Sequence, residues 1–273
     1  MRMNKMRTLR LKKMKAEGQK IVMLTAYDFF MAHLLDEAGA DIILVGDSVG
    51  MVHLGFENTL SVTLDMIIHH CAAVSRGVKS ALLVGDMPFM TYKINEDEAL
   101  RNAARLVQEA GAEAVKIEGG AEVARFAARI VNAGIPVMGH IGLVPQSLHQ
   151  LGGYRVQGKH EEDVERLLRD AVAMEEAGAF SLVIEAVPPE VGRRITESVG
   201  IPTIGIGAGP YCDGQVLVTN DLLGMTHQKP PHFVKQYADL RSVADQAIRE
   251  FIKDVRSGAF PDKEHCYPSV KQE

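Results

Sequence analysis

The chain has 273 residues, 47% of them hydrophobic and 24% charged, with a formal net charge of −5. This predicts a globular protein with a sizeable core. No apolar run approaches the roughly 20 residues of a membrane helix, and no basic stripe interleaved with aromatic residues suggests a nucleic-acid partner. The three cysteines, Cys71, Cys212 and Cys266, are widely separated, form no metal-ligand pair or disulfide framework, and favour a cytoplasmic location.

The first twenty residues are basic, with eight Lys or Arg and one Glu. One interpretation is a transit peptide, because such peptides are basic and poor in acids. The segment is short, however, and lacks serine enrichment. Leu9, Leu11 and Met14 instead favour a short helix over about residues 8–17 that packs before the first strand.

Beyond this helix, short apolar runs alternate with longer amphipathic stretches. The stretches at 97–111 and 161–178 predict helices, and Gly39, Gly111 and Gly178 are expected to end helices in the left-handed conformation. The short runs predict buried parallel strands. Eight candidate strands follow in chain order: 21–26, 41–46, 80–85, 113–118, 136–141, 180–185, 202–207 and 215–220.

Eight strands joined by crossover helices in about 250 residues predict an α/β protein of the (β/α)8 TIM-barrel class. The alternative is a doubly wound open sheet. Its first strand is usually followed by a glycine-rich dinucleotide turn, whereas this chain has TAYDFF at residues 25–30. No linker or change in composition divides the chain, so we expect a single barrel domain over residues 1–273.

Polar residues gather where the predicted strands end. A lone acid at a strand end is more often a helix cap, but the carboxyl ends of barrel strands surround the active site. Crowded carboxylates repel each other unless a cation or protons intervene, and oxygen ligands suit Mg²⁺. The strand-end residues are Tyr27, Asp28, Asp47, Ser48, Asp86, Lys116, Glu118, His140 and Glu185.

These side chains predict distinct roles. Asp47 is expected to be a metal ligand, and Lys116 either neutralises the acids or holds an anionic substrate group. His140 is either a core histidine or a site residue. Glu185 lies between apolar residues, which favours a partly desolvated carboxylate that acts as a general base. The residues alone therefore predict metal-assisted proton abstraction next to the carbonyl of a small anionic compound.

A series of motifs follows in chain order: TAYD (25–28), GDSVGMV (46–52), GDMPF (85–89), VKIEGG (115–120), GHIGLVPQS (139–147), LGGYRVQGK (151–159), IEAVP (184–188), GIGAG…DGQ (205–215) and AFPDKEH (259–265). Together these motifs resemble those of the ketopantoate hydroxymethyltransferase (3-methyl-2-oxobutanoate hydroxymethyltransferase) family. The resemblance covers nearly the whole chain, and GHIGLVPQS together with LGGYRVQGK is its most specific part.

The resemblance implies a Mg²⁺-dependent TIM-barrel enzyme of pantothenate synthesis. It would transfer a one-carbon unit from 5,10-methylenetetrahydrofolate to 3-methyl-2-oxobutanoate, and form a large homo-oligomer, a decamer of pentameric rings. By motif, Glu185 accepts the proton, and Glu118 is on the metal directly or through water. The metal ligands implied are Asp47, Asp86 and Glu118, and the keto-acid contacts implied are Asp47, Ser48, Asp86, Lys116 and His140.

The chain departs from the family pattern at three positions. Thr91 and Asn95 replace serines, and His53 replaces an apolar residue, which affects the expected lid or folate contacts. Two rival functions remain. One is a Mg²⁺-dependent lyase or mutase of the phosphoenolpyruvate-mutase type acting on a small 2-oxo acid. Its lyases carry a catalytic cysteine, for which Cys212 is the one candidate. The other is a non-enzymatic binding barrel in which the acids are helix caps.

Overall fold

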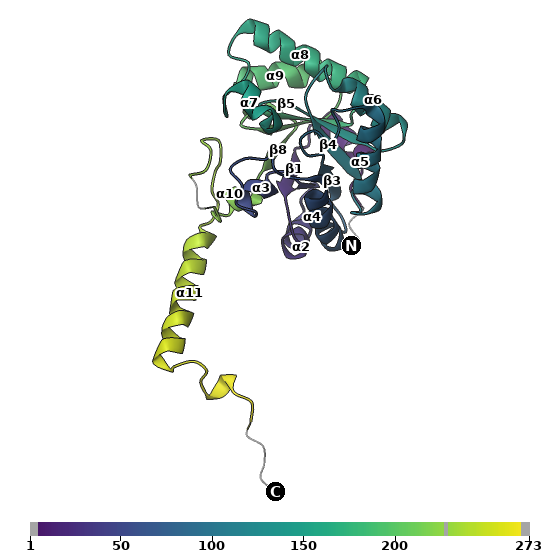
Figure 1. Cartoon of the computed structure of the whole chain (residues 1–273). Helices are drawn as coiled ribbons and strands as arrows, with labels where there is room; N and C mark the ends of the chain where they lie inside the picture. Colours follow the sequence, from purple (N-terminus) through teal and green to yellow (C-terminus); the bar gives the residue numbers. More distant parts are fainter. Residues whose placement is uncertain (1–4, 227–228, 269–273) are drawn as a thin grey trace. The chain divides into compact units, whose positions relative to one another are not determined.

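Eight parallel strands close into a barrel in which each strand pairs with its neighbours in chain order (Figure 1). The structure, a computed structural model, describes residues 5–226 and 229–268. The barrel closes where β1 pairs with β8, and it confirms the predicted (β/α)8 fold. The strands are β1 (Ile21–Thr25), β2 (Ile42–Val45), β3 (Leu82–Asp86), β4 (Ala114–Glu118), β5 (Val137–Gly142), β6 (Ser181–Glu185), β7 (Thr203–Ile206) and β8 (Gly214–Leu217).

Helices join most of the strands and cover the outside of the barrel (Figure 1), whereas β7 and β8 are joined by a loop without a helix. Gly39, Gly111 and Gly178 have positive φ angles of 92°, 73° and 88°, as expected for glycines that end helices. Within the described part of the chain, no helix is long and apolar enough to cross a membrane. The helices are α1 (Thr8–Ala16), α2 (Phe29–Ala38), α3 (Val49–Val52), α4 (Leu64–Gly77), α5 (Glu96–Gln108), α6 (Ala124–Asn132), α7 (Leu148–Leu151), α8 (Glu161–Glu176), α9 (Pro189–Ser198), α10 (Thr219–Leu222) and α11 (Leu240–Ser257), with 3₁₀ turns at η1 (Pro145–Ser147) and η2 (Lys263–His265).

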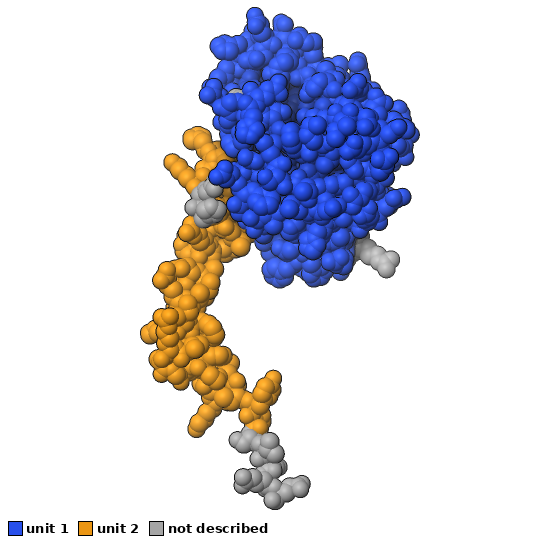
Figure 2. Space-filling model, in the orientation of Figure 1, with its two compact units in different colours: residues 1–219 blue, residues 220–273 orange. Residues whose placement is uncertain are grey.

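The chain divides into two compact units, residues 1–219 and 220–273 (Figure 2). The barrel predicted for residues 1–273 occupies the first unit, and the second contains α11 and η2. No residue of α11 is buried, and Val243, Ile248 and Phe251 are exposed by 63%, 59% and 55%. The helix α11 of the second unit therefore carries several exposed apolar side chains.

The strands are buried on both faces, which explains their continuous apolar sequences. One apolar cluster lines the barrel interior and another fills the space between strands and helices. Side chains alternate between these faces along each strand. Val84 on β3 and Ala114 on β4 belong to the interior cluster, so Asp86, Lys116 and Glu118 continue the interior row toward the carboxyl ends of the strands.

The expected N-terminal helix is α1, which packs at the amino ends of the strands. Leu11 and Met14 are buried in the interior cluster, whereas Leu9 is exposed. The Lys15 ammonium group donates to carbonyl oxygens of Thr196, Val199 and Ile201 at 3.1, 2.9 and 2.9 Å. These carbonyls belong to the last turn of α9 and the segment after it, where a cation is favourable. The basic residue thus has a structural role.

Candidate active site

The register of the strands brings the predicted site residues together. Asp86 on β3 lies opposite Lys116 on β4, and Glu118 on β4 lies opposite His140 on β5. Glu185 ends β6, opposite Gly142 on β5. Because the polar side chains share the inward-facing positions, they form one cluster at the carboxyl end of the barrel, where TIM-barrel active sites are built.

Asp86 and Lys116 form a buried ion pair, with Asp86 Oδ1 2.8 Å from Lys116 Nζ. Burial by itself would lower the pKa of Lys116, but the carboxylates of Asp86, Glu118 and Asp47 together raise it above its usual range. Burial raises the pKa of Asp86, and the charge of Lys116 only partly offsets this effect. Lys116 therefore remains an ammonium ion inside the cluster.

His140 lies between two carboxylates. Its Nδ1 is 3.4 Å from Glu118 Oε1, and its Nε2 is 3.1 Å from Glu185 Oε2. The contact between His140 Nε2 and Glu185 Oε2 is within ion-pair distance but lacks the alignment of a hydrogen bond, so it is an electrostatic contact. Burial and the Lys116 charge lower the pKa of His140, yet the two carboxylates raise it to about 9. The predicted apolar setting of Glu185 is thus wrong on one side, where its carboxylate lies 3.1 Å from the His140 imidazole.

Asp47 follows β2 and meets Asp86 through the backbone. Its N–H donates to Asp86 Oδ2 at 3.2 Å, and its own Oδ2 accepts from Gln146 Nε2 at 3.0 Å. Burial raises the pKa of Asp47 well above its usual range, and repulsion from Asp86 and Glu118 adds to this effect. Three carboxylates in one buried space favour protons or a cation as a partner.

Two residues after β1 behave differently from each other. The Tyr27 hydroxyl and Ser48 Oγ lie 2.8 Å apart, which joins the segment after β1 to the residue that follows Asp47. Asp28 instead caps α2, accepting from Met31 N–H at 2.8 Å. The expectation that Asp28 joins the acidic rim is therefore wrong, because its oxygen satisfies a free donor of the helix.

The departures from the family pattern have local structural roles. Asn95 caps α5 by accepting from Glu98 N–H at 2.8 Å, and Thr91 Oγ1 donates to Pro88 O at 2.7 Å. Both are bonds that a serine hydroxyl can also make. The His53 ring packs edge-on against Tyr27, with 4.8 Å between the ring centroids.

Sequence reasoning missed two site residues, Gln146 and Tyr92. Gln146 Nε2 bonds to Asp47, and Gln146 N–H donates to Glu118 Oε2 at 2.9 Å. The Tyr92 hydroxyl lies 2.9 Å from Gln146 Oε1 and 2.8 Å from the carbonyl oxygen of Glu118. Gln146 lies within the motif GHIGLVPQS, so the motif could have indicated it as a site residue. Tyr92 lies in a loop outside the motifs, and no sequence pattern indicated it.

The donor set fits Mg²⁺ in one particular way. In the described residues, no group of three or more His, Cys, Asp or Glu side chains is arranged to hold a metal ion. Mg²⁺ commonly binds one or two carboxylates and completes its shell with water and substrate oxygens. Asp47 and Asp86 supply such a pair, although Asp86 Oδ1 already forms the ion pair with Lys116. Both oxygens of Glu118 already face partners, Gln146 N–H and His140, which favours its contact through water.

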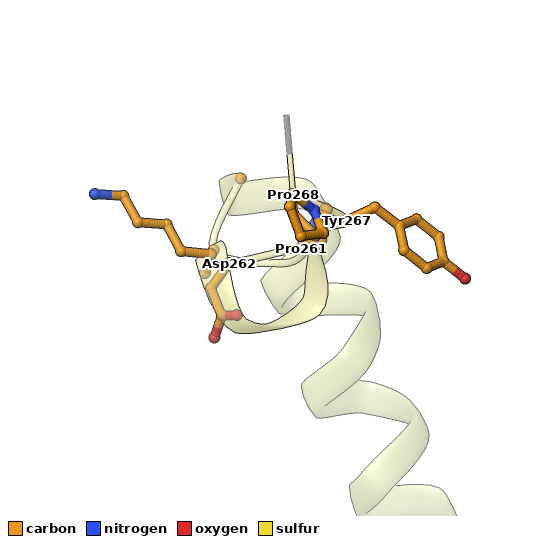
Figure 3. A pocket seen from close by; sticks show the side chains of 8 residues that line it. Pro261, Asp262, Tyr267 and Pro268 are labelled. Atoms are coloured by element: carbon orange, nitrogen blue, oxygen red, sulfur yellow. The ribbon is translucent and has the colours of Figure 1, made fainter. Parts of the chain in front are cut away.

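A surface pocket in the second unit is formed by the turn around η2 and is separate from the candidate active-site residues. It is lined by residues between 258 and 268, and none of the predicted site residues contributes (Figure 3). Asp262 accepts from the N–H groups of Glu264 and His265 at the start of η2. Tyr267 is fully exposed, and its ring points away from Pro261.

Related folds and sequences agree with this architecture. Phosphonopyruvate hydrolase, solved in complex with oxalate and Mg++, superposes with a TM-score of 0.61 at 17% identity, covering 97% of this chain and 93% of that chain. A 2,3-dimethylmalate lyase superposes with a TM-score of 0.58 at 18% identity, covering 95% of this chain and 91% of that chain. At these identities the similarity establishes the fold alone. A barrel with buried acids, a lysine and a histidine at its strand ends defines the class: a TIM-barrel enzyme.

Sequence relatives define the family. The family described as ketopantoate hydroxymethyltransferase matches residues 5–263. The 3-methyl-2-oxobutanoate hydroxymethyltransferase of Thermoanaerobacter sp. (strain X514) is 55% identical over 269 residues, 98% of each chain. That of Syntrophomonas wolfei is 53% identical over 263 residues, 96% of this chain and 95% of the relative. The chain belongs to the ketopantoate hydroxymethyltransferase family and is a transferase.

Proposed function

We propose that this protein transfers a hydroxymethyl group from 5,10-methylenetetrahydrofolate to 3-methyl-2-oxobutanoate, giving 2-dehydropantoate (ketopantoate) for pantothenate synthesis. The observation that carries the proposal is the buried cluster in which Asp47, Asp86 and Lys116 meet at the barrel end that also holds Glu185. The names of the relatives support the hydroxymethyl group and its acceptor, 3-methyl-2-oxobutanoate.

Mg²⁺ is the proposed cofactor, held by Asp47 and Asp86, with Glu118 through water or as a direct ligand. When bound, it would supply positive charge that stabilises the oxyanion developing on the 2-oxo oxygen. The buried carboxylates repel each other without such a cation, which supports the assignment.

The keto acid would be held by the charged groups around this centre. Lys116 would attract the anionic end of the substrate, and Ser48 would donate or accept a hydrogen bond at the edge. Asp47 and Asp86 would contact the substrate at the metal position, and His140 would lie beside the reacting carbon with Glu185. Lys116 already balances part of the acidic charge, so the site accepts an anion together with a divalent cation.

Glu185 is the proposed proton acceptor. Its side chain is 16% exposed, compared with 1% for Glu118, so it can face a substrate in the barrel mouth. The C3 proton of the keto acid would move to the Glu185 carboxylate, and the electron pair left on C3 would form the new bond to the one-carbon unit. In the overall reaction, water supplies the hydroxyl oxygen and tetrahydrofolate is released.

A lyase of the phosphoenolpyruvate-mutase type is the second candidate, because its members share this fold. Those lyases need a reactive cysteine, whereas Cys212 is fully buried and burial raises the pKa of its thiol. A neutral buried thiol is a poor acid or nucleophile. This observation favours the transferase.

The assay incubates the protein with 3-methyl-2-oxobutanoate, 5,10-methylenetetrahydrofolate and Mg²⁺ and follows ketopantoate by NMR. We expect product in the complete mixture and none when the folate is omitted or the metal is chelated. Absence of ketopantoate, with cleavage of a 2-oxo acid in the absence of folate, would support the lyase instead.

We also propose a homo-oligomer, a decamer by family resemblance, in the cytoplasm. The exposed apolar side chains of α11 support self-association, because exposed apolar surface of this kind commonly marks a protein interface. The proposed partners are limited to the keto acid, the folate and further copies of the chain, with no nucleic acid or membrane. Cys71 and Cys212 are free and buried, as suits a reducing compartment.

A further inference from the structure

Gln146 occupies the centre of a buried hydrogen-bond network that joins three strand ends. Its Nε2 donates to Asp47 Oδ2 and to Met87 O, both at 3.0 Å. Its backbone N–H donates to Glu118 Oε2 at 2.9 Å. The side chain is 2% exposed. One residue in the turn after β5 therefore contacts the segments that follow β2 and β3 and the last residue of β4.

The neighbours of Gln146 fix which way its amide points. Asp47 Oδ2 and Met87 O are acceptors, so the amide NH₂ group must face them and its oxygen must face Tyr92. The Tyr92 hydroxyl accepts from Glu118 N–H at 3.0 Å, and its single proton is shared between Glu118 O at 2.8 Å and Gln146 Oε1 at 2.9 Å. Tyr92 is completely buried. The hydroxyl thus holds the amide in the orientation that serves Asp47.

A neutral amide has a particular consequence at this place. It satisfies one oxygen of Asp47 without adding positive charge, so the negative charge of the carboxylate stays available to a cation. Gln146 also holds the Asp47 side chain in one rotamer, because Gln146 is itself fixed by contacts with three separate segments of the chain. A charged partner such as Lys116 would instead compete with the cation.

We propose that Gln146, locked by Tyr92, is a positioning residue that presents Asp47 to the divalent cation. The inference rests on the metal site of the proposed function, but not on the identity of the substrates. It assigns Gln146 and Tyr92 no direct contact with the reacting atoms.

The test measures Mg²⁺ affinity by calorimetry on metal-free protein, together with Tm. Gln146→Met removes both Nε2 donors but keeps the backbone bond to Glu118. We expect its Mg²⁺ Kd to rise by about 10- to 100-fold, the range for partners that orient metal ligands. Tyr92→Phe should raise Kd by a smaller factor of about 3 to 10, since the amide bonds survive while its orientation is no longer fixed.

Thr196→Val is the matched control. Thr196 Oγ1 also makes two buried bonds, to Gly192 O and Thr203 Oγ1, each 2.8 Å long. This variant should lower Tm yet keep Kd within about twofold of the wild type, because no site residue is touched.

Two results would overturn the proposal: a Kd within twofold of the wild type in both site variants, or an equal rise in Thr196→Val. If Gln146→Met does not fold, Tyr92→Phe decides by the same criterion. A wild type that binds Mg²⁺ but makes no ketopantoate would refute the proposed function and leave this inference standing. Turnover with unchanged Kd in the variants would refute the inference alone.

Discussion

At the scale of residues, the site is a set of buried charges that are only partly balanced. Lys116 balances Asp86, and His140 lies between Glu118 and Glu185, whereas Asp47 has a neutral partner. Burial and repulsion raise the pKa of Asp47, so a negative charge on this carboxyl group is unfavourable unless a cation is nearby. The site is therefore arranged to gain a cation.

Asp47→Asn and Asp86→Asn should each weaken Mg²⁺ binding at least about tenfold, because each removes a charged ligand. Asp47→Asn should not lower the Tm of the metal-free protein markedly, because one repelling charge is lost. Asp86→Asn also loses the Lys116 ion pair and should be the less stable of the two. Calorimetry and thermal melting measure both effects. Unchanged Mg²⁺ affinity in both variants would contradict the metal assignment.

The thiols provide a second prediction at this scale. Burial raises the pKa of Cys71 to about 12, Cys212 is also buried, and Cys266 is exposed. Because the thiolate is the reactive form, Ellman's reagent should modify one thiol quickly in the native protein and three in denaturant. Cys266→Ser should abolish the fast phase. Rapid reaction of Cys212 would instead support the lyase as the function of the protein.

How far the site could be predicted depended on the kind of contact. Strand-end positions revealed Asp86, Lys116, Glu118 and Glu185, because period and fold class determine where such side chains point. Gln146 was not predictable from local pattern, since its bond to Asp47 spans 99 positions of sequence. Whether an acid caps a helix or faces the site, as Asp28 illustrates, depends on side-chain geometry.

At the scale of elements, the β5–β6 pair positions the proposed base. Gly142 has a φ of +94°, and Leu143 N–H donates to Glu185 O at 2.9 Å. A Cβ on Gly142 would overlap that carbonyl oxygen. The end of β5 must therefore be glycine for the backbone of Glu185 to keep its place.

Gly142→Ala should destabilise the protein and displace Glu185, with loss of activity. Gly134→Ala is a matched control, because Gly134 has a φ of +92° but open space around its Cβ position. The control should lower the free energy of unfolding by about 1–2 kcal/mol, because alanine is strained in the left-handed conformation. Gly142→Ala should lower the free energy of unfolding by at least about 2 kcal/mol more, because its Cβ also overlaps the carbonyl oxygen of Glu185. Urea unfolding measures both, and equal costs would contradict this account.

The elements themselves were largely predictable. Buried parallel strands have continuous apolar runs and α5 and α8 have clear helical periods, so the eight strands and both helices form close to the predicted positions. The eighth strand is shorter than predicted, because it ends at Leu217 and Thr219 begins α10. The division at residue 219 was not predicted. The amphipathic period of α11 indicates a helix with an apolar face, but it does not indicate what that face packs against.

At the scale of the whole molecule, α11 is the feature that most needs a partner. Phe251 and Val255 lie on one side of the helix with Ile248, at spacings of three and four residues, and all are about half exposed. We expect light scattering to give a mass several times the 29.8 kDa of one chain. A monomer would contradict the proposed oligomer.

A charge placed on the apolar face of α11 should reduce that mass. Phe251→Glu should lower the oligomeric state and Tm, because a carboxylate in an apolar interface is unfavourable. Gln246→Glu is the control, since position 246 lies on the opposite face at 3.6 residues per turn. Equal masses for both variants would place the interface elsewhere.

The central claim is that Glu185 removes the C3 proton of the keto acid at a metal-assisted site. The most direct measurement is deuterium exchange at C3 of 3-methyl-2-oxobutanoate in D₂O with Mg²⁺ and no folate, followed by the NMR signal of the C3 hydrogen. The wild type should exchange this hydrogen. Glu185→Gln should bind Mg²⁺ and keto acid but lose the exchange, because an amide keeps the shape and cannot accept the proton. Exchange by Glu185→Gln as fast as in the wild type would contradict the assignment and make another residue the base.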